Sequence, residues 1–268
     1  TRKTYADLMR EYILPAIGEM EVSQVLKAHL QGLNNELIGK ISGSRVNMVI
    51  AVERLFFREA AENGFTSLNP ATNLKRAKIV QSEIKPLSKE QVMTTLACVE
   101  EFYRPLFTFL AMTGARPNEA YALKWKAIDF ERSKISITEG RVCGVEDTPK
   151  SRAGKRDIFM PPALRQVLLE LNVGNPDQHV FTAKNGDPMN GNISRVWQRA
   201  LEKAGLPDQP AYNLRHAFIS TAIKEGVDIS YVSQAAGHRD VTVTLQRYNR
   251  CIEDGANKEE LKLASLFA

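Results

Sequence analysis

The hydrophobic and polar positions of the N-terminal part of the chain follow a helical period. Apolar residues at this spacing predict amphipathic helices over residues 5–14, 22–37 and 45–63. We expect the first helix to stop at Pro15, because proline lacks the N–H that a helix interior uses. Ser44 precedes the third helix, and Gly64 is expected to cap its end. Asn69-Pro70 is interpreted as a further helix start.

A polar stretch over residues 79–85 carries no core pattern and predicts a linker, so we place a domain boundary near residue 80. Ser88 and Gln91 then have the spacing of a capping box. Helices are predicted over 91–112, ending at Gly114, and from Pro117 to about residue 124.

Alternating patterns over 134–138 and 156–160 predict two strands, and the polar residues 148–155 between them are typical of a hairpin turn. The pattern is helical again from residue 162, with helix ends expected at Gly205, Gly226 and Gly237. The predicted fold class is therefore mainly α with a small antiparallel β-sheet. A helical domain over residues 1–80 precedes an α+β domain over 81–268.

Composition narrows the class of protein only modestly. The chain has 268 residues, 43% of them hydrophobic, with a formal net charge of +5. This charge suits a polyanionic partner, although a solvated basic surface would explain it equally well. The three cysteines lack the spacing of a zinc site and favour a reducing, cytoplasmic setting. Neither a membrane-spanning run nor a signal peptide is recognisable.

Four separate segments carry candidate chemistry, and each would be unremarkable alone. Arg116 follows a glycine stop and precedes a new helix, where a guanidinium and a helix N-terminus together suit a phosphate. Lys150 lies in the polar turn and could act as a mobile acid. Arg215 shares a helix face with Tyr212, three positions earlier. His216 is interpreted as an ordinary packed or exposed histidine. The fourth segment has His238 after a glycine, followed by a helix that carries a tyrosine.

Taken together, the ordered motifs Thr-Gly-x-Arg-x-x-Glu, Leu-Arg-His, Gly-His and Tyr resemble the tyrosine recombinase family, the phage-type integrases. The resemblance covers most of the chain. It implies a helical core-binding domain over 1–80 and a catalytic domain with a C-terminal tail over 81–268, and it leaves open whether an N-terminal arm-binding domain was removed. The implied catalytic residues are Arg116, Lys150, Tyr212, Arg215, His238 and Tyr248, with Glu119 supporting Arg116.

By this resemblance the protein is a site-specific recombinase that cleaves and rejoins DNA through a covalent 3′-phosphotyrosyl intermediate. Integration or excision of a mobile element is the expected role. Two fixed guanidiniums suit the charge that builds on a phosphodiester under attack, so we expect neither a metal nor another cofactor. A type IB-like topoisomerase and a non-catalytic DNA-binding regulator on the same fold are the alternatives.

Two departures from the family pattern stand out. Tyr212 occupies a position that is usually histidine, and Tyr248 follows His238 by ten residues where many members have nine. The expected partners are double-stranded DNA, further copies of the chain in a tetrameric synapse, and accessory DNA-bending proteins. The location would be the bacterial nucleoid. Whether the tail packs on its own subunit or on a neighbour is left open. Candidate phosphate contacts are Arg45, Arg54, Arg58, Lys75, Arg76 and Lys78.

Overall fold

The computed structural model describes residues 2–79, 85–142, 144–147, 155–171, 173–189 and 193–253. The chain packs into two units, Thr1–Glu83 and Ile84–Ala268. The domain boundary expected near residue 80 lies close to this division. Most of the C-terminal tail and the hairpin turn at 148–154 lie outside the described residues.

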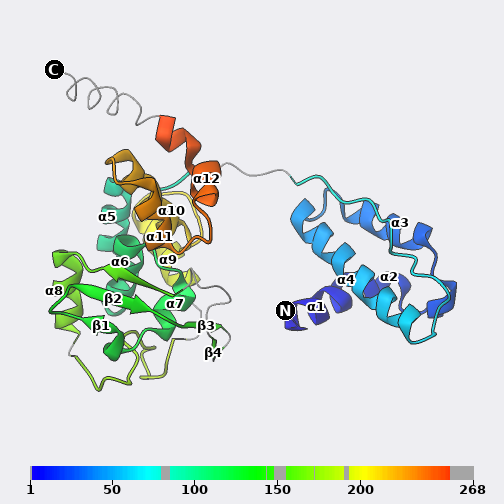
Figure 1. The fold of residues 1–268 in the computed structure, drawn as a ribbon, viewed down its shortest axis with the longest axis horizontal. Coiled ribbons are helices and arrows are strands. Elements are labelled where there is room, and N and C mark those ends of the chain that lie inside the picture. The colour runs from blue at the N-terminus through cyan, green and yellow to red at the C-terminus, as the bar shows by residue number, and fades with distance from the viewer. Residues whose placement is uncertain are drawn as a thin grey trace. The chain divides into compact units, whose positions relative to one another are not determined.

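The first unit is helical. Its elements are α1 (Arg2–Leu8), the π-helical η1 (Met9–Ile13), α2 (Leu14–Ile17), the 3-10 turn η2 (Val22–Gln24), α3 (Lys27–Leu37) and α4 (Gly43–Glu62) (Figure 1). Their apolar faces meet in one core, whose most deeply buried residues include Leu8, Leu30, Val46, Ile50 and Phe57. The helical period read from the sequence therefore marks the faces that pack together.

Three details of this unit differ from the sequence-based expectation. The first helix continues past Pro15, which lies in the first turn of α2, after the chain has widened into the π-helical turn η1. Ser42, not Ser44, caps α4, and its hydroxyl accepts from the Arg45 backbone N–H. Asn69 begins a turn rather than a helix, since its side chain accepts from the N–H two residues later.

A buried carboxyl joins α3 to α4. Glu53 is fully buried and accepts a hydrogen bond from the Asn34 side chain at 2.8 Å. Its Oε1 and the Asn34 Oδ1 have no hydrogen-bond partner among the described residues. Burial raises the pKa of Glu53 to about 7, although Asn34 and Arg54 act in the opposite direction. Protonation removes the buried charge and supplies a donor.

This carboxyl predicts that the first unit weakens as pH rises. The folded state holds the proton more tightly than the unfolded chain, whose carboxyl titrates near 4.5. Its contribution is therefore complete below that pH and is lost as pH rises through about 7. The full loss is roughly 3 kcal/mol at 1.36 kcal/mol per pKa unit. In the whole chain, hydrogen exchange of the α3 and α4 amides should lose protection between pH 5 and pH 8. Glu53→Gln should remove most of this dependence, and an unchanged pH response in that variant would contradict the assignment.

The second unit combines helices with a small sheet. Its helical elements are α5 (Lys89–Cys98), η3 (Glu101–Tyr103), α6 (Arg104–Thr113), α7 (Pro117–Ala122), η4 (Trp125–Ala127), α8 (Pro162–Glu170), α9 (Ser194–Lys203), α10 (Asn213–Lys224), α11 (Ile229–Ala236) and α12 (Val241–Glu253). Strands β1 (Ile128–Asp129), β2 (Lys134–Ile137) and β5 (Arg156–Phe159) form an antiparallel sheet in that order. β3 (Gly140–Val142) pairs with β4 (Val145–Asp147). The predicted fold class is thus confirmed.

The single helix expected over 91–112 is wrong, because the chain forms α5 and α6 instead. Val99 leaves the helical conformation with ψ 139°, and Pro105 then occupies the first turn of α6. The capping box of Ser88 and Gln91 at the start of α5 is confirmed. The hairpin β3–β4 was not anticipated from the sequence, since its strands are too short to show an alternating pattern.

Three helices of the second unit, α10, α11 and α12, gather at one end of it. In Figure 1, α10, α11 and α12 lie together beyond α6, and β1 and β2 lie at the other end with α8 beside them. A core centred on residues such as Phe107, Phe109, Ile135, Leu164 and Trp197 holds the two ends together. In the part of the chain that the structure describes, no helix is both long and apolar enough to cross a membrane.

Candidate active site

Two glycine turns form the frame of the site. Gly114 ends α6 with φ 63°, and Gly237 ends α11 with φ 71°. A side chain at either position would collide: a Cβ would lie 2.4 Å from Phe218 Cδ1 at Gly114, and 2.8 Å from Arg156 Cζ at Gly237. Glycine permits the left-handed turn and the close approach at once. The glycine motifs seen in the sequence therefore mark the points where these elements meet.

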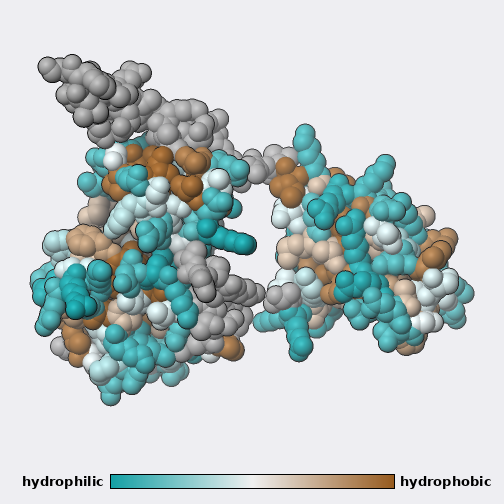
Figure 2. Space-filling view, viewed as in Figure 1, coloured by the Kyte–Doolittle hydropathy of each residue, from teal (hydrophilic) through white to brown (hydrophobic). Residues whose placement is uncertain are grey.

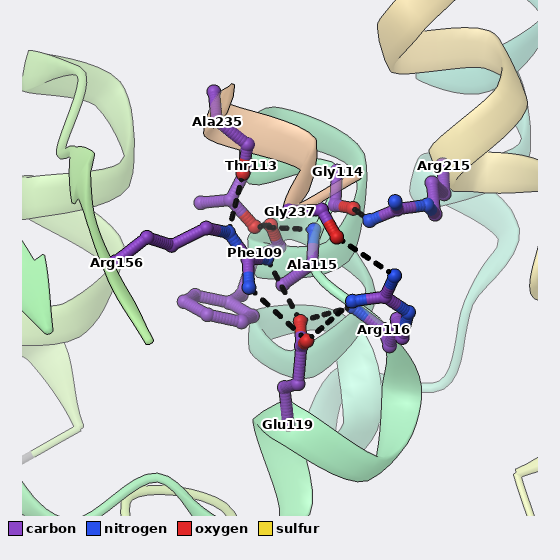
Figure 3. Close-up of polar contacts among 10 residues, drawn as sticks. All are labelled: Phe109, Thr113, Gly114, Ala115, Arg116, Glu119, Arg156, Arg215, Ala235 and Gly237. Carbon is purple, nitrogen blue, oxygen red and sulfur yellow. Dashed lines mark hydrogen bonds and ion pairs between the residues drawn. The ribbon is translucent and has the colours of Figure 1, made fainter. Parts of the chain in front are cut away.

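The carbonyl oxygen of each turn holds one of the arginines expected in the site. Gly114 O accepts from Arg215 Nη1 at 2.8 Å, and Gly237 O accepts from Arg116 Nη2 at 3.0 Å. Figure 3 shows the two guanidiniums approaching these turns from different helices. Arg116 precedes α7 and Arg215 lies in α10, so residues distant in the sequence are brought together as the motif spacing indicated.

Glu119 fixes the Arg116 side chain from below, in the view of Figure 3. Its Oε1 accepts from Arg116 Nη1 at 2.8 Å, and its Oε2 accepts from the Arg116 backbone N–H. The same carboxylate pairs with Arg156 Nη2 at 2.9 Å. Burial alone would raise the pKa of Glu119, but the two arginines outweigh it and lower that pKa below its ordinary value. The supporting role that the sequence suggested for Glu119 agrees with this geometry.

Arg156 was missed by the sequence analysis. Its side chain is 3% exposed and donates to Glu119 and, at 2.6 Å, to the carbonyl oxygen of Ala235 in α11. It thereby ties β5 to the α7 start and to the end of α11. The alternation of the strand could have identified Arg156, since it points to the same side of β5 as the buried Ile158. A charged residue on the buried face of a strand requires a partner.

Arg215 is almost completely buried, with 1% of its surface exposed, yet one part of its guanidinium lacks a partner. Among the described residues, none makes a hydrogen bond to its Nη2. Burial, and then the charge of Arg116, lower the pKa of Arg215 to about 10, so it remains charged at neutral pH. Two neighbouring cations and an unsatisfied buried donor together favour an anion at this place.

His238 follows the Gly237 turn and is half-buried. Its Nδ1 forms a 2.7 Å hydrogen bond with the Thr244 hydroxyl in α12. Burial is the main cause that lowers the pKa of His238 to about 4, and Arg215 and Arg116 contribute further. The imidazole is therefore neutral at pH 7, and its remaining nitrogen can interact with a bound anion.

Tyr248 lies in α12, where its ring packs against Ile219, Ile223 and Val232 and is 3% exposed. Its φ of −120° and ψ of 20° interrupt the helix at this residue. Its hydroxyl forms a short hydrogen bond with Nδ1 of His216 in α10. The packing of His216 agrees with the sequence-based interpretation, but its contact with the expected nucleophile could not be read from the sequence.

Tyr212 precedes α10 and has 37% of its surface exposed. The edge of its ring faces His216, with the ring centroids 5.3 Å apart. Lys150 lies outside the described residues. Lys155 is exposed and lines a pocket with Arg156 and His238, so the returning strand brings a second lysine near the site.

The candidate phosphate contacts of the first unit differ in their availability. Arg45 pairs with Glu11 at 2.9 Å, and Arg54 donates to backbone carbonyl oxygens, including Leu74 O at 2.9 Å. These two arginines therefore have structural partners, and Arg58 pairs with Glu59 and Glu62 at the surface. Arg58 and Arg76 are exposed and line one groove with Arg54, Asn47, Asn69 and Thr72. Lys75 and Lys78 are also exposed. The face of this unit in Figure 2 is largely hydrophilic.

Within the described ranges, the structure has no group of three or more His, Cys, Asp or Glu side chains placed to hold a metal ion. The site described above consists of arginines, a glutamate and neutral histidines, with Tyr248 in contact with one of these histidines.

Comparisons with known proteins identify relatives of the whole chain. The chain is 23% identical to the tyrosine recombinase XerC-like protein of Caldanaerobacter subterraneus, over 92% of this chain and 73% of the relative. It is 26% identical to tyrosine recombinase XerA of Thermococcus onnurineus, over 98% of this chain and 88% of the relative. Both relatives carry the name of the family that the motifs resemble.

Solved structures share the fold. The integrase of transposon Tn1549 in complex with transposon right end DNA superimposes with a TM-score of 0.78, at 20% identity, over 98% of this chain and 93% of that one. A lambda integrase dimer bound to a core site gives a TM-score of 0.72 at 17% identity, over 92% and 89% of the two chains. The model of the phage integrase family matches residues 83–253, which hold every described site residue, and the chain belongs to that family of tyrosine recombinases and integrases.

Proposed function

We propose that the protein is a site-specific DNA recombinase that cleaves and rejoins DNA with Tyr248 as the nucleophile. The observation that carries the proposal is the neighbouring pair of guanidiniums, of which Arg215 is buried and Arg116 is half-buried. The Nη2 of Arg215 has no partner among the described residues. The positively charged Arg116 is close to it, and Glu119 holds the Arg116 side chain in position. A scissile phosphate would supply the acceptor and the negative charge that this place lacks.

The chemistry follows from the positions of the charged groups. Attack on a phosphodiester builds charge on its non-bridging oxygens, and arginines held in advance stabilise that charge at little reorganisation cost. His238 can add a hydrogen bond from the side of α11. The phosphotyrosyl bond conserves the energy of the broken phosphodiester, so that a 5′-hydroxyl can reseal the strand without a nucleotide cofactor.

Integration or excision of a mobile element is the role we assign to this activity. Relatives named as prophage integrases and the fold shared with the Tn1549 integrase support it. Strand exchange joins two DNA duplexes, so we expect several copies of the chain to assemble on DNA. The exposed Arg58, Lys75, Arg76 and Lys78 are the candidates for phosphate contacts in the first unit.

The test begins by selecting a target duplex from a random-sequence pool by binding to the whole protein. A series of such duplexes, each nicked at a different position, then serves as suicide substrates that release a short 5′-hydroxyl fragment on cleavage. We expect a covalent adduct at a defined position, followed by joining to a strand of a second duplex. Relaxation of supercoiled plasmid without joining between duplexes would indicate a type IB-like topoisomerase. The absence of any adduct would indicate a non-catalytic DNA-binding protein.

Tyr212 is expected to act as a hydrogen-bond donor near the scissile phosphate. Its phenol can donate a hydrogen bond, but the oxygen of a neutral phenol is too weakly basic to take a proton from another tyrosine. Tyr212→Phe should therefore slow cleavage by no more than roughly a hundredfold, the low end for a positioned proton-transfer group. Tyr212→His should keep or raise the rate. Wild-type rates in both Tyr212→Phe and Tyr212→Ala would mean that the side chain only packs at the helix start.

Lys150 is predicted to protonate the departing 5′ oxygen, as the resemblance implies, with Lys155 as its competitor. A substrate with a 5′-bridging phosphorothiolate distinguishes them, because sulfur leaves without a proton. Lys150→Ala should cleave the ordinary substrate slowly and the sulfur substrate near the wild-type rate. Lys155→Ala should show no such rescue. Rescue of Lys155→Ala alone would reverse the assignment, and it would agree with the pocket that Lys155 shares with His238.

A further inference from the structure

The hydroxyl of Tyr248 has a specific partner inside the protein. His216 Nδ1 forms a hydrogen bond with this hydroxyl, and the two ring centroids lie 5.8 Å apart. Both residues are buried, with 6% and 3% of their surfaces exposed. Their helices, α10 and α12, pack through the cluster that contains Ile219 and Val232. The packing of both helices therefore holds the two side chains in contact, as it would not for two exposed side chains.

His216 is in the protonation state that a proton acceptor needs. Burial, followed by the charges of Arg247 and Arg215, lowers the pKa of His216 to about 4, so the imidazole is neutral at pH 7. A neutral imidazole has one nitrogen with a proton and one with a free lone pair. With the proton on Nε2, the Nδ1 lone pair faces the Tyr248 hydroxyl and can receive its proton.

The other groups near the nucleophile are less suited to this task. His238 has its Nδ1 engaged by Thr244 at 2.7 Å, and its remaining nitrogen is the one that can interact with the bound phosphate. Tyr212, at the position where the family usually has histidine, carries a phenol that is a poor base at neutral pH. Resting on the function proposed above, we propose that His216 is the catalytic base that takes the proton from Tyr248 as it attacks the scissile phosphate.

The step is balanced in atoms and electrons. The Tyr248 O–H bond breaks and its proton moves to the Nδ1 lone pair of His216. The phenolic oxygen forms a bond to phosphorus, and the bond from phosphorus to the 5′ oxygen breaks. The general acid protonates that oxygen, which leaves as a 5′-hydroxyl. In the rejoining step an incoming 5′-hydroxyl gives its proton to the deprotonated general acid and bonds to phosphorus. The bond from phosphorus to the phenolic oxygen breaks, and that oxygen recovers its proton from the His216 imidazolium.

DNA binding should strengthen this base at the moment it is needed. In the free protein, the positive charges of Arg247 and Arg215 disfavour a further cation on His216. A phosphate bound at Arg215 brings negative charge to the same place and offsets part of that effect. Burial, the largest cause of the low pKa of His216, remains, so a bound phosphate makes proton transfer from Tyr248 easier by reducing only the contribution of the arginine charges.

Single-turnover cleavage of the selected suicide duplex tests the proposal in the whole protein. His216→Asn retains an amide oxygen that can accept the Tyr248 hydrogen bond, but an amide cannot take up a proton. We expect this variant to bind the duplex as the wild type does and to cleave it roughly 10²- to 10⁴-fold more slowly, the range for general base catalysis. The sulfur-leaving substrate should not rescue it, because the defect lies on the attacking side. His179→Asn, at a histidine remote from Tyr248, is the matched control and should cleave normally.

The outcomes separate this inference from the proposed function. An adduct formed by His216→Asn at the wild-type rate would overturn the role of His216 and leave the recombinase proposal intact. If even the wild type forms no adduct, the proposed function fails. Nitrogen NMR of the ¹⁵N-labelled protein still shows whether His216 Nδ1 carries a proton. We expect His216 Nδ1 to resonate as an unprotonated nitrogen and to shift in Tyr248→Phe. A protonated Nδ1, which donates to the tyrosine, would overturn the proposal without any DNA.

Discussion

The Tyr248→Phe variant is expected to bind the selected duplex with wild-type affinity and to form no covalent adduct with it. Phenylalanine fills the same space against Ile219, Ile223 and Val232, so the variant should retain the packing of α12. It loses the hydroxyl that attacks phosphorus and that meets His216. Removing a nucleophile costs on the order of 10⁶ in rate in well-studied covalent enzymes, which places residual cleavage below detection in this assay.

Tyr231→Phe is the matched control for this experiment. Tyr231 lies in α11 of the same unit, is 52% exposed, and has no part in the site as described. The control should form the adduct at the wild-type rate. An adduct that persists in Tyr248→Phe and maps to another residue, above all Tyr212, would show that the nucleophile has been assigned wrongly. Weak binding by Tyr248→Phe would instead mean that the hydroxyl matters for the fold of α12.

The residues that sequence reasoning could place are those whose neighbours along the chain fix their geometry. Gly114 and Gly237 mark helix ends, and Arg116 and His238 follow them within two residues, so the backbone at these positions is set locally. Arg215 lies in the first turn of α10, and its orientation toward Gly114 follows from that helix start. Local structure of this kind is encoded within a few residues and is therefore readable.

The residues that were missed depend on contacts across the fold. Arg156 is recognised only when β5 is placed beside α11 and the start of α7, which no short pattern reveals. His216 and Tyr248 are 32 positions apart in the sequence and meet because α10 packs on α12. The helix break between α5 and α6 did have a local signal, because Glu100 and Glu101 interrupt the apolar pattern and Pro105 lies in the first turn of α6.

Arg215 gives the second large expected effect. Its guanidinium performs two tasks at once, because Nη1 donates to Gly114 O while Nη2 stays without a partner among the described residues. Lysine keeps the positive charge but has a single compact ammonium, which cannot hold the Gly114 turn and a phosphate oxygen in a planar arrangement. Arg215→Lys should therefore bind DNA within a few-fold of the wild type while its cleavage rate falls by roughly 10³-fold or more, as for other arginines that stabilise phosphoryl transfer.

The burial of Arg215 makes a folding control necessary. The fluorescence of Trp125 and Trp197, both buried in the same unit, reports whether the Arg215→Lys variant keeps its core. Arg132→Lys is the matched substitution at an exposed position, where the side chain is 81% exposed, and should leave the cleavage rate unchanged.

If Arg215→Lys keeps its fold and cleaves within threefold of the wild type, charge alone suffices at this position. The unsatisfied Nη2 would then have no role in holding the phosphate. If binding and cleavage fall together, Arg215 holds the ground state and the transition state equally, and the specific stabilisation of the attacked phosphate must come from Arg116.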